Sequence, residues 1–482
     1  MRSLPIVCKT TFSNIWLRRI CDWQTEGICA YLLIIGFFTR PLRKRSRGIM
    51  PVSNKSHIIG HDFVNIAATI GPHPAFHALL RDLSRFGATS EGGIHRPEGT
   101  PANGEARRYL ADWFRQRGHR IVVDRIGNMF GIVELAGPDA PLVMTGSHID
   151  SQPNGGCLDG TYGVVAGCIA AETIASDVAA GGLRPKANLC VAAWMNEEGA
   201  RWQPSTLGSG TYVGDFALDY ALARKDGDGV SVAEALSEIG WLGSDEPPDM
   251  PSAYVELHVE CGPVLERRNL RFGVFKRWWG CRKIELRIDG APSHTGPTLM
   301  SERRDALHAA AQIISAVRQF ADEAPRDVMH TSVGRIEVWP NSPNVVPSRA
   351  RLFIELRSAE EPMIDDAFAR LEAEIEKTAG ATQTSMTIER DEYRRPGRFS
   401  DKLASLAEAT ARGLAGEVLA LDTIPAHDAV RLAPFTPSIV IAVPSIGGLC
   451  HTPLERTEPA DLALGLDVLT TMLRKLIENG GA

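Results

Sequence analysis

Four short segments of this chain are unusually rich in side chains that bind metal ions. Residues 145–160 read TGSHIDSQPNGGCLDG and directly follow an apolar, strand-like run, and residues 196–199 read NEEG and follow a second such run that ends at Trp194. Residues 256–260 read ELHVE, and residues 450–453 read CHTP after a third strand-like run. Because ligands from the carboxyl ends of separate strands converge in the crevice of an open α/β sheet, these segments predict such a sheet with one polar site at its edge.

The hydrophobic periodicity outside these segments agrees with an α/β fold. The expected elements are, in chain order, an amphipathic helix at 103–117, strands at 119–123, 129–135 and 141–145, a buried helix at 163–174 and a strand at 187–194. Continuous apolar strands that alternate with helices are typical of a largely parallel sheet covered on both faces. We therefore expect an α/β domain with a mainly parallel sheet.

The pattern changes after about Trp279. The expected elements there are a strand at 282–289, a helix at 301–321, strands at 332–338 and 351–357, a helix at 361–378 and a strand at 383–390. This β-α-β-β-α-β order is that of a ferredoxin-like module. From about residue 402 the α/β pattern resumes with a helix, a strand at 438–443 and a helix at 459–479. The sequence thus predicts an α/β domain in two parts, 50–280 and 396–482, interrupted by a ferredoxin-like domain at 281–395.

The first 49 residues differ in charge from the rest of the chain. The 482 residues carry a formal net charge of −6, yet residues 1–50 hold nine Lys and Arg side chains against two acidic ones. Their apolar run at 28–38 is 11 residues long, shorter than the roughly 20 residues that a membrane-spanning helix needs. We therefore expect residues 1–49 to lie outside the fold and predict no stable membrane insertion. A targeting or anchoring segment and a structured extension are the alternatives.

Composition limits the class of partner and the compartment. The acidic remainder of the chain argues against a nucleic acid or an anionic membrane as its main partner, because both require a basic surface. The nine cysteines are scattered and form no CxxC pair, which is typical of reduced thiols in a cytoplasmic protein. A small-molecule substrate and a cytoplasmic location are the simplest expectations.

The four segments hold the side chains that a pair of metal ions requires. Three imidazoles and two carboxylates suffice when one carboxylate is shared between two metals, and the candidates are His148, Asp159, Glu198, His258 and His451. A single His or Asp in a Gly-rich loop is more often a turn or cap residue. The prediction of a metal site therefore rests on the occurrence of all five candidates together. Asp150 stands two residues after His148, and this spacing lets its carboxylate orient the imidazole. Glu197 and Glu198 point to opposite sides in an extended chain, so one can bind metal while the other acts as a general base.

From about residue 80 to the C-terminus the chain resembles the amidase/hydantoinase/carbamoylase branch of the aminoacylase-like dimetal hydrolases. This branch includes N-carbamoyl-L-amino-acid hydrolases, allantoate amidohydrolases and β-ureidopropionases. The resemblance lies in the ordered motifs GSHIDSQPNGGCLDGTYGV, MNEEGARWQPSTLGSG, ELHVECGPVLE, SHTGPTLMSERRDAL, PNSPNVVP, ELRS, AHDA and GLCHTP. The NEEGAR form is similar to the members that hydrolyse ureido compounds rather than to the peptidases.

The resemblance implies a role for each matching residue. It implies two divalent ions per subunit, zinc or manganese with cobalt or nickel as further options, one held by His148, Asp159 and His258 and the other by Asp159, Glu198 and His451. Glu197 would be the general base, and His294 would stabilise the oxyanion, reaching the site from a partner subunit in a homodimer formed through the inserted lid domain. Asn344 and Arg357 would bind the substrate carboxylate. His427 and Asp428 of AHDA would support the ligands, as Asp150 does.

Several positions depart from the family pattern. Cys261 follows ELHVE where the family usually has a Gln that contacts the ureido group, and Cys450 precedes His451 where Ser is usual. A thiol is a weak hydrogen-bonding group, so Cys261 suggests an altered substrate pocket around a retained hydrolytic site. Three hypotheses follow: hydrolysis of an N-carbamoyl amino acid or related ureido acid, hydrolysis of another linear amide such as an N-acyl amino acid or dipeptide-like compound, and a non-catalytic metal-binding relative.

Overall fold

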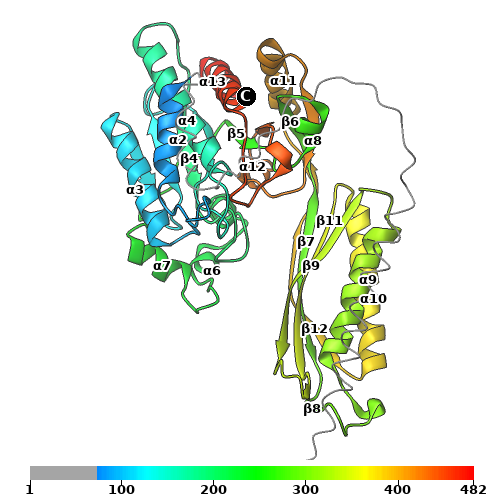
Figure 1. The fold of residues 1–482 in the computed structure, drawn as a ribbon. Coiled ribbons are helices and arrows are strands. Elements are labelled where there is room, and N and C mark those ends of the chain that lie inside the picture. The colour runs from blue at the N-terminus through cyan, green and yellow to red at the C-terminus, as the bar shows by residue number, and fades with distance from the viewer. Residues whose placement is uncertain (1–72) are drawn as a thin grey trace, which may run out of the picture. The chain divides into compact units, whose positions relative to one another are not determined.

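The structure, a computed structural model, describes residues 73–482, so the prediction for residues 1–49 lies outside the described residues. A nine-stranded sheet has the order β1-β2-β4-β3-β5-β15-β6-β13, with β14 beside β6. Figure 1 labels β4, β5 and β6 of this sheet. Its strands are β1 (Arg120–Val123), β2 (Met129–Val133), β3 (Leu142–His148), β4 (Asn188–Trp194), β5 (Ala253–Val259), β6 (Gly273–Trp278), β13 (Gly397–Arg398), β14 (Leu419–Thr423) and β15 (Ser438–Val443).

The centre of this sheet is parallel. Strands β4, β3, β5 and β15 are neighbours and run in the same direction. Every residue of these four strands is buried except Leu142, the first residue of β3. Antiparallel pairs flank this centre: β1, β2 and β4 alternate in direction on one side, and β6 opposes β15 and β13 on the other, where β14 pairs with β6 in parallel. The mixed α/β fold with a mainly parallel central sheet is thus confirmed, and antiparallel pairing is confined to the margins.

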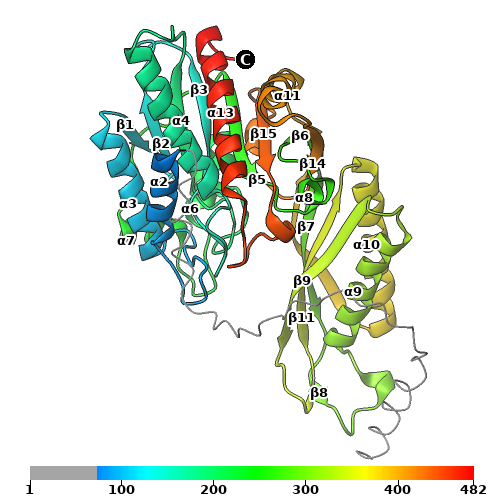
Figure 2. The ribbon, with the colours of Figure 1, turned by 45° about the horizontal axis from the view of Figure 1, so that its top comes forward.

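Helices cover both faces of the parallel strands (Figure 2). The helices of this part are α2 (Pro74–Ser84), α3 (Pro101–Gln116), α4 (Thr161–Ala179), α5 (Leu207–Tyr212), α6 (Leu218–Leu222), α7 (Val232–Ile239), α8 (Val264–Arg268), α11 (Asp401–Ala415), α12 (Asp428–Leu432), the 3-10 turn η3 (Ile446–Gly448) and α13 (Pro459–Asn479). Alternate residues of β5 face opposite layers: Leu257 meets Gly163 of α4 and Gly465 of α13, whereas Glu256 accepts a hydrogen bond from the N–H of Ala429 in α12.

Helix α4 forms the centre of the larger core. Among the described residues it is the one helix with the length and apolar composition of a membrane span. It packs against α2, α13 and strands β3, β4 and β5, and its residues from Thr161 to Ala171 are buried. This is the environment of a core helix between a sheet and its covering helices.

Residues 280–394 form a separate antiparallel sheet with its own core. Its elements are β7 (Gly280–Asp289), α9 (Ala306–Glu323), β9 (Met329–Trp339), β11 (Arg349–Ser358), α10 (Glu361–Thr382) and β12 (Ser385–Arg394), with a small ribbon of β8 (Ser293–His294) and β10 (Val345–Val346) and the 3-10 turn η2 (Met300–Glu302). The strand order is β12-β7-β11-β9. Ile284, Leu286 and Ile288 of β7 face α9 and α10, and the alternate residues form the open face of this sheet.

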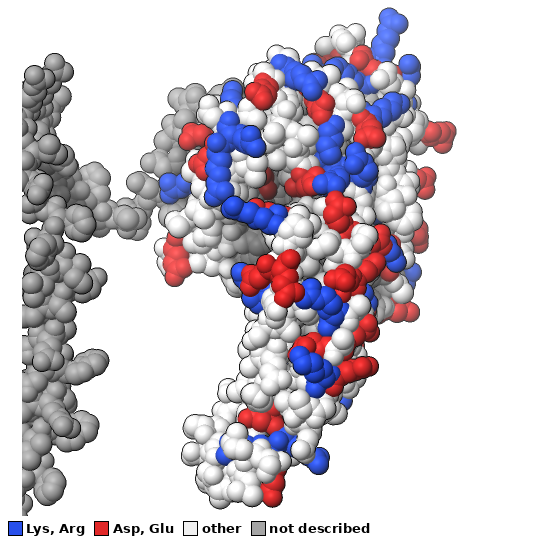
Figure 3. Space-filling model, turned by 90° about the vertical axis from the view of Figure 1, so that its right-hand side faces the viewer, with Lys and Arg blue, Asp and Glu red and all other residues white. Residues whose placement is uncertain are grey.

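The expected elements match the observed ones to within five residues at each end, and the largest differences are at the end of α4 and at the start of α9. The helix expected from residue 301 begins at Ala306, because the Asp305 side chain accepts hydrogen bonds from the N–H groups of Leu307 and His308 and caps it. Basic and acidic side chains are intermixed on the face shown in Figure 3. The antiparallel sheet also contains ion pairs, such as Arg282 with Asp391.

A buried ion pair joins α3 to the loop that follows β4. The Glu98 carboxylate accepts hydrogen bonds from Arg107 at 2.9 and 3.2 Å and from the N–H of Asn196 at 3.2 Å. Arg107 also donates to the Gly127 carbonyl at 2.7 Å. Both charged side chains are fully buried, so neither can exchange its partner for water.

We expect the substitution Arg107→Leu to destabilise the protein by about 3–5 kcal/mol, because it leaves the Glu98 charge buried and unpaired. The measurement is urea unfolding followed by circular dichroism. The neighbouring Arg108 is exposed, so Arg108→Leu is the matched control and should change the free energy of unfolding by less than about 0.5 kcal/mol. Equal effects of the two substitutions would contradict a structural role for the pair.

Candidate metal centre

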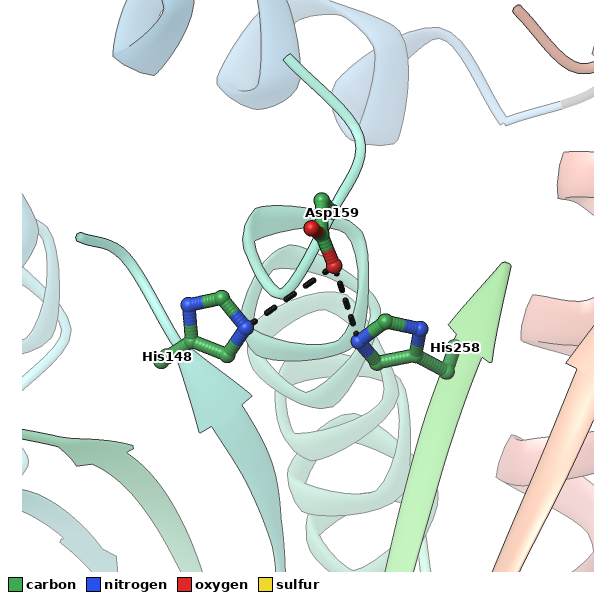
Figure 4. Close-up of side chains that lie close together, drawn as sticks. All are labelled: His148, Asp159 and His258. Carbon is green, nitrogen blue, oxygen red and sulfur yellow. Dashed lines mark ion pairs between the residues drawn. The ribbon is translucent and has the colours of Figure 1, made fainter. Parts of the chain in front are cut away.

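The carboxyl edge of the parallel strands brings the predicted ligands together. His148 ends β3, His258 lies near the end of β5, and Asp159 lies in the loop before α4. Figure 4 shows the two imidazoles pointing toward Asp159 from opposite sides. Glu198 follows β4 and His451 follows β15, so all five candidate ligands meet at one place although they are far apart in the sequence.

The Asp159 carboxylate is shared by two groups of ligand atoms. Its Oδ1 lies 3.2 Å from Nε2 of His258 and 3.9 Å from Nε2 of His148. Its Oδ2 lies 3.0 Å from Nε2 of His451, which is itself 3.2 Å from Oε2 of Glu198. Within each group of three the ligand atoms lie within 4.8 Å of one another. This geometry fits two cations that share one carboxylate.

The backbone orients the imidazoles for ligation. Nδ1 of His148 faces the carbonyl of Asp150 at 3.0 Å, and Nδ1 of His258 faces the carbonyl of Val259 at 2.8 Å. A proton on each Nδ1 satisfies these carbonyls and leaves each Nε2 free to bind metal. Gly160 has a positive φ of 63°, and a Cβ there would lie 2.4 Å from the His148 ring. Glycine at this position therefore lets the Asp159 loop close over the imidazole.

The electrostatics of the cluster favour cations. Burial by itself would raise the pKa of Asp159, but hydrogen bonds from His258 and His451 outweigh it and hold that pKa well below its usual range. The hydrogen bonds to Asp159 and Glu198 raise the pKa of His451 to about 11. Protons and metal ions compete for the same imidazole nitrogens. The high proton affinity of the His451 imidazole therefore indicates that the surrounding carboxylates favour a positive charge at this place, which a metal ion can also supply.

Two neighbouring glutamates have different environments. Glu198 is held by Gln152, which donates from its backbone N–H at 3.1 Å and from Nε2 at 3.0 Å. The Glu197 carboxylate lies 3.6 Å from Nε2 of His148. Burial first, and then repulsion from Asp428 and Glu198, raises the pKa of Glu197 well above its usual value. A buried carboxyl group with a raised pKa is suited to accept and release a proton near neutral pH.

The predicted supporting residues lie behind the ligands. Asp150 accepts hydrogen bonds at 3.3 Å from the N–H groups of both Glu197 and Glu198, and so fixes the turn that carries them. The ring of His427 packs edge-on against His258 at 4.7 Å between centroids. Asp428 accepts a hydrogen bond from the Ser209 hydroxyl at 2.5 Å. None of the three belongs to the groups His148–Asp159–His258 and Asp159–Glu198–His451, although His427 forms a separate close group with Glu256 and His258.

Two thiols lie beside these ligands. The Sγ atoms of Cys261 and Cys450 are 2.6 Å apart, and both cysteines are free. Sγ of Cys450 lies 3.4 Å from Oδ2 of Asp159, and Sγ of Cys261 lies 3.8 Å from Nδ1 of His258. The departure from the family pattern at Cys261 therefore falls within the site, and Cys450 accompanies it there.

The predicted substrate-binding residues are divided between two places. His294 pairs with Val345 in the β8–β10 ribbon, and the N–H of Thr295 donates to the Asn344 carbonyl at 3.2 Å, so His294 and Asn344 are neighbours. His294 lies shortly after the last residue of β7, and Asn344 lies shortly before the first residue of β11. Arg357 lies near the opposite end of β11. Ten residues of β7 span about 30 Å. Within one chain the structure thus does not bring His294 and Asn344 to Arg357.

Arg357 lines a cleft of about 380 Å³ between the open face of the antiparallel sheet and the loops near α12. The cleft also contains Arg394 and Arg431, which the sequence did not single out. Arg394 lies near enough to Glu197 for the two charges to interact, so the cleft adjoins the ligand cluster. Only the pairing of β12 with β7 brings Arg394 there, and this register cannot be read from local sequence.

Glu455 is a further residue that the sequence analysis missed. Its Oε1 accepts hydrogen bonds from the N–H groups of Leu158 and Asp159 at 2.7 and 3.0 Å, so it holds the loop that positions the shared carboxylate. The one sequence feature that could have indicated Glu455 is its position two residues after the CHTP segment. Burial, together with the nearby charge of Asp159, raises the pKa of Glu455 to about 7.

A parallel sheet whose carboxyl edge holds buried imidazoles and carboxylates, with a further acid beside them, is the arrangement of a metal-dependent hydrolase. Residues 144–475 match peptidase family M20/M25/M40, and the chain belongs to this family. The resemblance described from the sequence motifs is confirmed at the level of the family and its hydantoinase/carbamoylase relatives.

Two relatives and one solved structure illustrate this similarity. The chain is 36% identical over 391 residues to an N-carbamoyl-L-amino-acid amidohydrolase of Rhizobium meliloti, which covers 81% of this chain and 93% of that protein. It is 32% identical over 404 residues to an allantoate amidohydrolase of Bacillus subtilis, which covers 82% and 95%. The crystal structure of an amidase of the hydantoinase/carbamoylase family from Burkholderia vietnamiensis matches with a TM-score of 0.78 at 32% identity, covering 84% of this chain and 97% of that one.

The raised pKa of Glu455 predicts a pH effect on the metal-free protein. The folded-state pKa of about 7 lies above the ordinary value of 4.5, so the native state binds the proton more tightly. This contribution to stability is complete below pH 4.5 and is lost as the pH rises toward 7, by up to about 3 kcal/mol. Glu455→Gln keeps the acceptor oxygen and removes the titration, so its free energy of unfolding should fall less between pH 5 and 8.

The measurement is urea unfolding of the two proteins in a chelator at several pH values. Glu458→Gln is the matched control, because Glu458 is exposed, and this variant should follow the wild-type pH profile. Identical pH profiles for wild type and Glu455→Gln would show that Glu455 is ionised in the folded protein throughout this range.

Proposed function

We propose that the chain is a metal-dependent amidohydrolase that cleaves the C–N bond of an N-carbamoyl amino acid or related ureido acid. The observation that carries the proposal is the sharing of Asp159 between two ligand groups, with Glu197 3.6 Å from a ligand imidazole. The relatives named N-carbamoyl-L-amino-acid and allantoate amidohydrolases support the substrate class. The reaction consumes one water and yields the amine, CO2 and ammonia.

In this proposal the subunit would hold two divalent ions, zinc or manganese with cobalt or nickel as further options. His148, Asp159 and His258 would bind one ion, and Asp159, Glu198 and His451 would bind the other. The donor set of imidazoles and carboxylates suits these metals. When bound, they lower the pKa of a water molecule and polarise the scissile carbonyl. Glu197 accepts the proton of that water and delivers it to the leaving nitrogen. The Asp150 carboxylate keeps Glu197 in position by accepting a hydrogen bond from the backbone N–H of Glu197.

The remaining predictions concern the substrate and the assembly. We propose that Arg357 binds the substrate carboxylate through its planar guanidinium. The separation of His294 and Asn344 from Arg357 within one chain supports a homodimer in which the ferredoxin-like domain at 281–395 serves as lid and dimer contact. His294 of the partner subunit would then stabilise the oxyanion and Asn344 of the partner subunit would help to bind the carboxylate. A cytoplasmic location and a small-molecule substrate complete the proposal.

A second candidate is the same chemistry on an N-acyl amino acid or dipeptide-like amide. The observation that favours it is Cys261, whose thiol lies beside His258. The family pattern usually has a Gln at this position, and that Gln contacts the ureido group of the substrate. Ammonia release and amine release, measured over N-carbamoyl, N-formyl and N-acetyl amino acids, separate the two candidates. Turnover of acyl but not of ureido substrates would replace the first proposal by the second.

Glu197→Gln should retain about two metal ions per chain and lose at least about 10²-fold in kcat, because it removes the proton acceptor and no proposed ligand. The measurements are metal content by atomic emission and steady-state turnover. The neighbouring substitution Glu198→Gln is the matched comparison and should lower both metal content and activity. Full activity of Glu197→Gln would overturn the mechanism, and wild-type protein that binds no divalent metal would overturn the assignment of the site.

A further inference from the structure

The register of the antiparallel sheet places two arginines in one row. Arg357 of β11 and Arg394 of β12 both lie opposite Cys281 of β7. Residues directly opposite one another in a sheet project from the same face, and here this is the open face, since the helices cover the alternate residues. Arg431 of α12 lines the same cleft as these two arginines. Three guanidinium groups thus converge beside the ligand cluster.

The three arginines differ in how far the protein satisfies them. Arg357 pairs with Glu355 at 2.7 Å and donates to the Ile424 carbonyl at 3.0 Å. Arg431 pairs with Asp215 at 3.1 Å and donates to the Thr206 hydroxyl at 2.9 Å. Arg394 makes one long hydrogen bond, of 3.4 Å, to the Trp279 carbonyl, and its Nε is buried without a partner. Within residues 73–482 it forms no salt bridge, so most of its donors are unused.

The cleft also contains Asp215 and Glu392, but these carboxylates pair with Arg431 and Arg390 and not with Arg394. Burial, and then repulsion from Arg357 and Arg431, lowers the pKa of Arg394 to about 10. The group nevertheless stays protonated at neutral pH, and a buried guanidinium N–H without an acceptor, such as the Nε–H of Arg394, is unfavourable. A carboxylate in the cleft would accept two parallel hydrogen bonds from Arg394 and relieve the repulsion.

We propose that Arg394, together with Arg431, binds a second carboxylate on the side chain of the substrate, so that the preferred substrates are N-carbamoyl derivatives of dicarboxylic amino acids. This inference rests on the proposed function, in which Arg357 binds the first carboxylate. Two strand spacings, about 10 Å, separate the backbones of Arg357 and Arg394, which suits two carboxylates of one small molecule. The cleft of about 380 Å³ is within the range of small-molecule sites, roughly 300–1,000 Å³.

The kinetic test uses two isosteric substrates, N-carbamoyl-L-glutamate and N-carbamoyl-L-glutamine, which differ in the charge of the side chain. Wild-type protein should show a kcat/KM at least about 100-fold higher for the glutamate derivative, and Arg394→Gln should remove that preference by lowering kcat/KM much more for the glutamate derivative than for the glutamine derivative. Arg394→Lys should restore part of the preference. Arg390→Gln is the matched control, since Arg390 lies on the same face of β12 but is paired with Glu285 and Glu392.

A preference of the wild type for the glutamine derivative, or an equal loss with both substrates in Arg394→Gln, would overturn the inference. The melting temperature of each variant verifies that it is folded, and Arg394→Lys provides the test if Arg394→Gln does not fold.

Binding of glutarate, followed by calorimetry on the metal-loaded protein, separates this inference from the proposed function. Glutarate should bind at least about tenfold more tightly than its monoacid analogue butyrate, and Arg394→Gln should abolish the difference. Binding that depends on Arg394, without turnover of any ureido acid, would retain the anion site and reject the proposed function. Turnover of ureido acids with glutarate binding that is independent of Arg394 would do the reverse.

Discussion

The buried carboxylate of Asp159 is the constraint on which the site depends. Its two oxygens face different groups of ligand atoms, contributed by strands β3 and β5 on one side and by the loops after β4 and β15 on the other. The loop that carries it is held by Glu455 from the C-terminal part of the chain. Because no segment of the sequence contains the site by itself, the site can form only after the parallel strands have assembled in the correct order.

Much of this arrangement could be predicted from the sequence, because the physical causes are local. The apolar runs of β3, β4 and β15 mark strands buried on both faces, and the polar residues that follow them must lie at one edge of the sheet. Strand β5 was harder to recognise, because Glu256 and His258 alternate with apolar residues in it although the whole strand is buried. Its polar side chains are satisfied by α12 and by Asp159, which are distant in sequence.

The residues that the sequence did not reveal depend on contacts between distant elements. Glu455 accepts hydrogen bonds from two backbone N–H groups of a loop almost 300 positions earlier in the sequence. Arg394 lies in the cleft because of the register in which β12 pairs with β7. A bulge between Ile388 and Arg390 shifts that register, so simple alternation along β12 would have placed Arg394 on the helix-covered face. Such positions follow from strand pairing and cannot be inferred from residue type or spacing.

The close contact of Cys261 and Cys450 has a practical consequence for any study of this protein. Two sulfur atoms 2.6 Å apart need little movement to join at the bond length of a disulfide, about 2.05 Å. A disulfide between them would lie next to Asp159 and His258, so oxidation would place a covalent link against two candidate metal ligands. We therefore expect metal binding to differ between reduced and oxidised protein.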